Sequence, residues 1–461
     1  MAHLGSSILW HETLETAAPG ASAAGELTAD VVIVGAGFTG LWSAYHLTTS
    51  DPSLDVAVLD AHDVAFGASG RNGGFAMTLL DFDLHRFAGN WGDEAAAHAH
   101  RAVARSVHEI DRTVREEGID AELEATGLLR VATSEAQLAR IQRDRETADR
   151  LGLDGFRLLD RDRTRAALDS PSYLGGLHED ACAIVNPAKL VVGLARVLRA
   201  RGVRIFEGSP VLDLTEADGG VTAVTPHATV RADTAVLATN AWAHRFPAAR
   251  GWSVPLYTYI VVTEPLSDAQ WERIGWQGRQ GVEDARNYVH YFRPTADGRI
   301  LWGGTDAVYR YGGPISPRRD RNEPIRRRLE RELLGTFPQL GRVRFSHHWG
   351  GPIAITSRFV PRIGRFDGGR IHYAFGYSGH GVAPAHTAGR ILRDLILGRD
   401  TDDTAVCFVD HAQTPFPPEP LTWIGAELTR QVLQRQDRRM DAGHDGGEVD
   451  PLILRALDRF A

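Results

Sequence analysis

Two short runs of apolar, mostly β-branched residues near the start of the chain predict two buried strands with a helix between them. The first run, 31–34, is followed by the glycine turn "GAGFTG" and then by "LWSAYHL", which has the pattern of a buried helix. The second run lies in "DVAVLD", residues 55–60. A strand, a helix and a strand in this order are typical of a βαβ unit with parallel strands.

Later segments repeat this alternation of helices and strands. Apolar positions at helical spacing predict an amphipathic helix over 93–117. In "NPAKLVVGLARVLRARGVRIFEG", Pro187 marks a helix start, the helix ends near residue 200, and a strand continues through residue 206. Residues 371–398 return to a strand, a glycine loop and a helix.

The residue pattern changes between residues 252 and 302. Aromatic and β-branched residues alternate there around a predicted hairpin turn at 296–299. We therefore expect an α/β fold in which a discontinuous, Rossmann-like cofactor domain carries an inserted substrate domain built on a mixed or antiparallel sheet. The expected boundaries are a tail at 1–27, a cofactor domain at 28–85, 170–248 and 349–411, a substrate domain at 86–169 and 249–348, and a helical tail at 412–461.

Composition narrows the class of protein. The 461 residues suffice for two domains, and the net charge of −8 disfavours nucleic acid or an anionic membrane as partner. No apolar run reaches membrane-span length and no secretory signal is visible, so we expect a cytoplasmic protein. The two cysteines form no disulfide framework or metal motif. Lys189 is the only lysine.

The glycine turn has the spacing of a dinucleotide-binding motif. Gly35 permits the tight turn, Gly37 lets a pyrophosphate approach the backbone, and Gly40 allows close packing of helix and strand. Asp60 follows the second strand, where a carboxylate accepts hydrogen bonds from ribose hydroxyls. These features alone leave both NAD and FAD open.

A second glycine-rich stretch, "GASGRNGG" at 67–74, favours FAD. An NAD dehydrogenase normally continues from its second strand into another βα unit. Here the chain brings bare backbone with Ser69, Arg71 and Asn72 close to Asp60, which suits a long cofactor lying extended along the protein.

Together with "ATNAW", "ADGRILWGG" and "GYSGHGV", these motifs resemble the D-amino-acid-oxidase-like (DAO) superfamily of FAD amine and amino-acid oxidoreductases. The resemblance runs from Trp10 to about Glu419 and is strongest to the branch that contains γ-glutamylputrescine oxidoreductase. It implies a small amine as substrate, and O2 or another electron acceptor as the second partner.

The resemblance also implies the cofactor site. The residues it places around FAD are Gly35, Gly37, Phe38, Thr39, Gly40, Asp60, Ser69, Gly70, Arg71, Asn72, Gly73, Val211, Thr239, Asn240, Gly376, Tyr377, Ser378, Gly379, His380 and Gly381. Among these, Arg71 and His380 are candidate catalytic residues, together with Tyr291.

Departures from the family pattern carry information too. Monomeric sarcosine oxidases of the superfamily place a lysine over the flavin, where this chain has Arg299, Ile300 and Leu301. The segment corresponding to their flavin-tethering cysteine has none, so we expect non-covalent FAD. Arg358 stands where the branch usually has an acid, and it would favour an anionic substrate group if it faces the site.

Candidate substrate contacts lie on the predicted inserted sheet. Alternation places Tyr257 and Tyr259 on one face, and Tyr291 and Arg293 on one face; Tyr288 lies nearby. Each of these aromatic residues also fits ordinary sheet packing. We expect no metal, because His347 and His348 lack partners at ligand spacing.

The sequence thus favours oxidation of a C–N bond in a small, primary or secondary amine to an imine, with O2 reduced to H2O2. An amine dehydrogenase with another acceptor, a D-amino-acid or N-methyl-amino-acid oxidase, and a non-catalytic flavin-binding partner protein remain alternatives.

Overall fold

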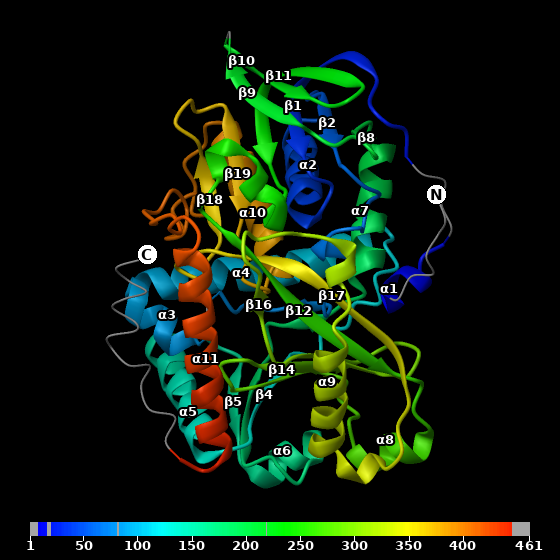
Figure 1. Ribbon diagram of the computed structural model, residues 1–461, viewed down its shortest axis with the longest axis vertical. Coiled ribbons are helices and arrows are strands. Elements are labelled where there is room, and N and C mark those ends of the chain that lie inside the picture. Colours follow the sequence, from blue (N-terminus) through cyan, green and yellow to red (C-terminus); the bar gives the residue numbers. More distant parts are fainter. Residues whose placement is uncertain (1–7, 16–19, 81–82, 218, 445–461) are drawn as a thin grey trace.

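Two large β-sheets form the framework of the protein, and the computed structural model describes residues 8–15, 20–80, 83–217 and 219–444 (Figure 1). The first sheet lies in the upper half of Figure 1, and the second extends from the middle into the lower half. The predicted helical tail beyond residue 444 lies outside the described residues. Within those residues, no helix combines the length and the apolar character needed to cross a membrane.

The first sheet contains the predicted parallel βαβ unit. Five neighbouring strands, β19-β11-β1-β2-β8, run parallel, and β18 pairs antiparallel at one edge. A meander of β9 and β10 continues from β11. The strands are β1 (Gly25–Val34), β2 (Val56–Leu59), β8 (Arg204–Phe206), β9 (Asp213–Ala217), β10 (Gly220–Val224), β11 (Ala228–Leu237), β18 (Arg362–Arg365) and β19 (Ile371–Phe375).

The central strands of this sheet are apolar on both faces, so both faces must be covered. Helices cover one of them. Helices α2 (Phe38–Ser50), α7 (Pro187–Ala200) and α10 (Val382–Ile396) share one core with Ile33 and Val58. On the opposite face, Val32 packs with Val221 of β10 and Val230 of β11. The helix predicted to begin at Pro187 is confirmed at its start and its end.

The second sheet is mixed. Its order is β16-β12-β15-β14-β13-β4-β6-β5, with β17 pairing β12, and only β13 and β4 are parallel neighbours. Its strands are β4 (Leu128–Ala132), β5 (Phe156–Leu159), β6 (Gly175–Glu179), β12 (Val254–Thr263), β13 (Gly281–Asp284), β14 (His290–Pro294), β15 (Ile300–Gly304), β16 (Val308–Tyr309) and β17 (Phe345–Ile355). The predicted turn at 296–299 joins β14 to β15.

The remaining helices surround the second sheet or connect it to the first. Leu329 and Leu333 of α9 pack against Phe292 and Trp302 of the sheet. A two-stranded sheet of β3 (Phe75–Ala76) and β7 (Ala183–Ile184) lies apart from both large sheets. The helices are α1 (Leu9–Glu12), α3 (Leu84–Trp91), α4 (Asp93–Glu116), α5 (Glu135–Arg150), α6 (Arg161–Ala167), α8 (Asp268–Ile274), α9 (Glu323–Thr336) and α11 (Leu421–Asp441).

Strand pairing differs in two places from the domain boundaries expected from sequence. β6 and β17 belong to the second sheet, although 170–248 and 349–411 were assigned to the cofactor domain. Residues 1–27 are more than a tail, because β1 begins at Gly25 and the side chain of Trp10 is buried. Sequence periodicity identifies strands but does not show which sheet a strand joins.

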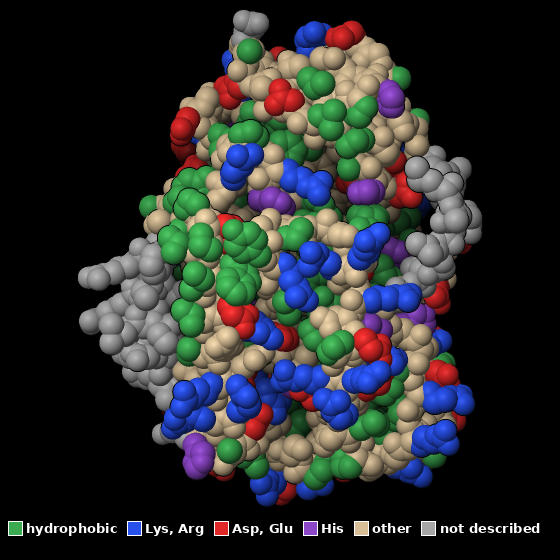
Figure 2. All heavy atoms as spheres, viewed as in Figure 1, with side chains coloured by type: hydrophobic (Ala, Val, Ile, Leu, Met, Phe, Trp, Pro, Cys, Tyr) green, Lys and Arg blue, Asp and Glu red, His purple; other side chains and the backbone are tan. Residues whose placement is uncertain are grey.

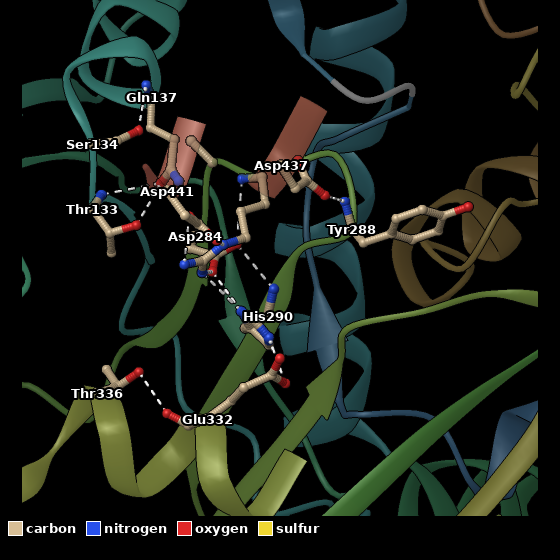
Figure 3. Close-up of polar contacts among 12 residues, drawn as sticks. Thr133, Ser134, Gln137, Asp284, Tyr288, His290, Glu332, Thr336, Asp437 and Asp441 are labelled. Atoms are coloured by element: carbon tan, nitrogen blue, oxygen red, sulfur yellow. Dashed lines mark hydrogen bonds and ion pairs between the residues drawn. The ribbon is translucent and has the colours of Figure 1, made fainter. Parts of the chain in front are cut away.

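A buried polar network joins α11 and α9 to the second sheet (Figure 3). The imidazole of His290 lies 2.7 Å from Asp284 and 3.0 Å from Glu332 of α9. Arg286 pairs with Asp284 and with Asp441 of α11. Burial alone would lower the pKa of His290, but the carboxylates of Asp284 and Glu332 outweigh it and raise the pKa to about 9.

We expect His290→Gln to lower the free energy of unfolding by about 3 kcal/mol at pH 6, because it removes one of the cations that face the carboxylates of Asp284 and Glu332. Since the folded-state pKa of His290 lies above its ordinary 6.5, its stabilisation is complete below pH 6.5 and is lost as pH rises through 9. Urea unfolding at pH 6 and pH 9.5 measures this. The difference between wild type and variant should shrink at the higher pH.

The control is His108→Gln, on the exposed face of α4, which should leave the free energy of unfolding within about 0.5 kcal/mol of wild type. An equal effect of His290→Gln at both pH values would contradict the assignment of a charged His290.

Candidate active site

The glycine turn lies where three parallel strands of the first sheet end together. Val34 at the end of β1 is in register with Leu59 of β2 and Leu237 of β11. Gly35 has φ of +112°, and a Cβ there would lie 2.6 Å from the carbonyl oxygen of Ala238. A Cβ on Gly40 would lie 1.9 Å from the carbonyl oxygen of Gly35. Only glycine fits at both positions, so the turn brings bare backbone to the edge of the sheet.

A cavity of about 380 Å³, which we call the cofactor cleft, opens at this edge. The N-terminus of α2 faces it without an acidic residue in its first turn, so its partial positive charge is available to an anion. The Asp60 carboxylate accepts hydrogen bonds from the backbone N–H groups of Ala36 and His62, at 2.7 and 2.9 Å. Burial raises its pKa to about 6, although these two bonds act in the opposite direction.

Most of the predicted cofactor residues line this cleft, which brings together segments far apart in sequence. A carboxylate, a helix N-terminus and bare glycine backbone fit the ribose and pyrophosphate of FAD. The hydroxyl of Thr239 is buried here and has no hydrogen-bond partner among the described residues, so it is available to a bound group. The predicted residues in the lining are Gly35, Gly37, Phe38, Thr39, Asp60, Ser69, Asn72, Val211, Thr239, Asn240, Tyr377, Gly379 and Gly381.

Three predicted cofactor residues line neither this cleft nor the cavity described below. They are Gly40, Gly70 and Gly376, and each lies where a Cβ would collide with a neighbouring segment. Gly376 donates its N–H to the side-chain oxygen of Asn240, at 3.1 Å. These glycines position the lining rather than form it.

The backbone of the glycine loop 67–74 is held by side chains from distant parts of the chain. The indole N–H of Trp10 donates to the carbonyl oxygen of Asn72 and that of Trp349 to the carbonyl oxygen of Arg71, both at 2.8 Å. Arg293 donates to the carbonyl oxygen of Gly74 at 3.0 Å. The loop therefore has a defined position between the two sheets.

Arg71 is a positioning residue of this loop rather than a free catalytic cation. Its guanidinium pairs with Asp320 at 2.9 Å and donates to the carbonyl oxygen of Phe66. Its aliphatic stem packs so closely that a Cβ on Gly351 would lie 2.7 Å from the Arg71 Cδ. The prediction that Arg71 lies beside the cofactor site is consistent with this position, but its charge is already paired.

A second cavity of about 430 Å³ adjoins the cofactor cleft; Ala68, Asn72, Ile353, Gly379 and Val382 line both. Its walls come from the second sheet, the glycine loop and α11. Of the predicted residues, those that line the second cavity are Arg71, Asn72, Gly73, Tyr288, Tyr291, Ser378, Gly379 and His380.

Tyr291 and His380, two of the residues predicted as catalytic, both line this cavity. The ring of Tyr291 lies over two glycines, since a Cβ on Gly303 would be 2.4 Å from its Cζ and one on Gly73 would be 2.8 Å from its Cε2. Burial raises its pKa, so the phenol keeps its proton at neutral pH. Burial, and secondarily the charge of Arg130, lowers the pKa of His380 to about 4, so its imidazole is neutral.

Four predicted substrate contacts do not line the second cavity. Tyr257 and Tyr259 share a face of β12, as predicted, but that face is buried against the core, and their hydroxyls donate to the carbonyl oxygens of Ser316 and Arg319. Leu256, Thr258 and Ile260 line the cavity instead. Alternation showed which residues share a face but not which face borders the cavity.

The two arginines predicted as substrate contacts lie elsewhere. Arg293 is fully buried beneath the glycine loop, where burial lowers its pKa to about 10. Arg358 is exposed and lies over the ring of Trp91, 5.4 Å from its centroid. Neither provides the anion anchor that the sequence suggested.

Sequence reasoning missed α11 as a wall of the site. Leu421, Ile424, Leu428 and Leu433 of this helix line the second cavity. Their spacing of three to five residues was a signal for an apolar helix face, but nothing local showed where that face packs.

The sequence matches the FAD dependent oxidoreductase (DAO) family over residues 30–395. The chain belongs to this family. It is therefore an FAD-dependent oxidoreductase, and the predicted resemblance and the predicted α/β fold are confirmed.

Named relatives of this DAO-family chain cover most of its length. It is 32% identical to γ-glutamylputrescine oxidoreductase of Escherichia coli over 407 residues, which cover 87% of this chain and 92% of the relative. Among solved structures, glycine oxidase from Geobacillus kaustophilus superposes with a TM-score of 0.70 at 20% identity, covering 84% of this chain and all of that one. L-proline dehydrogenase from P. horikoshii superposes with a TM-score of 0.69 at 20% identity, covering 84% and 96%.

We expect Asp60→Ala to weaken FAD binding by about tenfold or more, because it removes a charged hydrogen-bond acceptor at the end of β2. Titration of the apoprotein with FAD, followed by flavin fluorescence, measures the dissociation constant. The matched control is Asp55→Ala at the opposite end of the same strand, outside the cleft. Equal FAD affinities for the two variants would contradict the assignment of Asp60.

Proposed function

We propose that this enzyme oxidises the C–N bond of a small primary or secondary amine to an imine, which water then hydrolyses. The products are an aldehyde or oxo acid and ammonia or an amine. Bound FAD would supply the redox chemistry, since it would take up a hydride equivalent from the carbon next to nitrogen while a proton leaves the nitrogen, and O2 would then take up the two electrons and two protons and leave as H2O2.

The observation that carries this proposal is the junction between the cofactor cleft and the second cavity. A substrate in the second cavity meets the cofactor cleft at Asn72 and Gly379, beside His380. The names of the relatives, an amine oxidoreductase and an amino-acid oxidase among them, support an amine donor.

The protein's own side chains favour the neutral amine that hydride loss requires. His380 is uncharged at neutral pH, and its Nδ1 is buried without a hydrogen-bond partner among the described residues. An amine N–H donated to such a nitrogen would be oriented without facing a positive charge. The protonated phenol of Tyr291 supplies a second polar group in the same cavity.

The position of the only lysine of the sequence bears on the electron acceptor. Lys189 lies outside both cavities, paired with Asp120 and Glu122 at 2.9 and 2.7 Å. An amine dehydrogenase that uses another acceptor therefore stays a second candidate. We also propose that FAD is held without a covalent bond, since Cys182 and Cys407 line neither cavity.

The deciding measurement is the flavin absorbance near 450 nm during anaerobic mixing with a panel of amines, followed by admission of air. Bleaching by an amine and rapid recolouring with one H2O2 per turnover is the expected result. Bleaching without recolouring would replace the oxidase by a dehydrogenase. A flavin that dithionite reduces but no amine reduces would exclude amine oxidation and favour a flavin-binding partner protein.

We expect His380→Gln to lower the rate of flavin reduction by about tenfold or more at unchanged FAD content, because it removes the ring Nδ1 that would accept a hydrogen bond from the amine. Stopped-flow reduction at saturating amine measures this. His411→Gln is the control, because burial also lowers the pKa of His411 to about 4 but this side chain lines neither cavity. Equal loss of rate in both variants would contradict a role for His380 at the substrate.

A further inference from the structure

We infer that the amine substrate carries an uncharged hydrocarbon tail and that α11 is the element that recognises this tail. The inference rests on the proposed amine oxidation and names its substrate class. It replaces the anionic group that Arg358 would favour if it faced the site.

The walls of the second cavity away from the cofactor cleft are mostly hydrocarbon. Leu256 and Ile260 of β12 and Ile355 of β17 form one side, and Ile424, Leu428 and Leu433 of α11 form another. None of these six residues lines the cofactor cleft. A substrate whose amine reaches His380 at the junction therefore places the rest of its length against these apolar side chains. Each buried methylene contributes to binding in such surroundings.

Every charged side chain in the lining of the second cavity has an opposite charge beside it. Arg71 pairs with Asp320 at 2.9 Å. Asp306 pairs with Arg430 of α11 at 2.7 Å.

The third charge, the carboxylate of Glu283, lies 2.9 Å from Arg130, and Arg130 also contacts Asp83 and Asp144. A substrate carboxylate would thus enter without an unpaired cation among the described lining residues, because Arg71 already faces Asp320. Burying an anion without a partner is strongly unfavourable, which selects against an anionic tail, while the hydrocarbon walls favour an uncharged one.

The apolar surface continues from the cavity to the outside along α11. Leu421, Ile424 and Leu428 line the cavity and yet are 52%, 42% and 57% exposed. Figure 2 shows hydrophobic side chains gathered over the upper, N-terminal end of this helix. Exposed apolar side chains that line the mouth of a cavity indicate a surface that an apolar ligand crosses.

Polar contacts hold α11 in this position. Asp437 accepts hydrogen bonds from the backbone N–H groups of Asn287 and Tyr288, at 2.8 and 3.0 Å (Figure 3). The side chain of Tyr288 points away from this network in Figure 3 and lines the second cavity. The helix is therefore a fixed wall of the second cavity. It is bonded to the loop that carries Tyr288, another residue of the cavity lining.

The test compares three amines with the same six-carbon chain on the holoenzyme: hexylamine, 6-aminohexanoate and 1,6-diaminohexane. Anaerobic flavin reduction and kcat/KM are measured for each. We expect hexylamine to exceed both charged-tail compounds by at least tenfold. We also expect kcat/KM to rise by about threefold per methylene from propylamine to hexylamine.

Reduction of the flavin mainly by 6-aminohexanoate or by the diamine would overturn the uncharged tail and leave amine oxidation intact. If dithionite reduces the flavin and no amine does, the proposed function itself fails, and the inference fails with it. These outcomes distinguish the two claims.

Variants at Ile424 test whether α11 recognises the substrate tail. Ile424→Glu and Ile424→Arg should each lower kcat/KM for hexylamine by about fivefold to tenfold at unchanged FAD content. Trp423→Glu and Trp423→Arg are matched controls, because Trp423 is the neighbouring residue, is 40% exposed and does not line the cavity. These controls should leave kcat/KM within twofold.

The change in kcat/KM that each charged Ile424 variant shows with anionic, cationic and uncharged tails is the next readout. If Ile424 contacts the tail, Ile424→Arg should raise kcat/KM for 6-aminohexanoate relative to wild type with the same compound, and Ile424→Glu should do so for the diamine. No change of preference toward the charged tails in either variant would overturn the role of α11. Equal losses in the Ile424 and Trp423 variants would remove α11 from recognition.

Discussion

The backbone carbonyl groups of the glycine loop 67–74 accept hydrogen bonds from Trp10, Trp349 and Arg293, which come from three distant parts of the chain. A loop with so little side chain has few apolar contacts to hold it, so its position depends on these donors and on the pairing of Arg71 with Asp320. The loop separates the cofactor cleft from the second cavity and contributes to both linings. Its place determines where a cofactor and a substrate meet.

The two sheets contribute different physical properties to the site. The first sheet ends in bare backbone, a helix N-terminus and Asp60, which together suit phosphates and sugar hydroxyls. The second sheet, with α11, provides mostly apolar walls, and Asp306 in them is paired with Arg430. An uncharged, oriented amine at the junction of the two is the state from which hydride loss is easiest, and neutral His380 favours it.

Local sequence signals predicted the first sheet and the cofactor cleft well. The glycine turn, the helix start at Pro187 and the position of Asp60 after a strand depend on backbone sterics and on neighbours within a few residues, so they can be read from short stretches. Prediction was weaker for the substrate side. Tyr257 and Tyr259 do share a face, but Leu256 and Ile260 border the cavity, and the helix of residues 421–441 was not connected with the site.

The sequence by itself determined that this protein has a parallel βαβ unit with a dinucleotide turn, a second glycine loop for an extended flavin cofactor, and membership of an FAD-dependent family. Only the tertiary structure decided which face of β12 borders the second cavity, that Arg293 lies beneath the glycine loop, and that Arg358 lies outside the cavity at Trp91. The physical reason is the range of the interactions. Turn geometry and helix ends depend on adjacent residues, whereas burial and charge pairing depend on partners hundreds of residues away, such as Asp320 for Arg71.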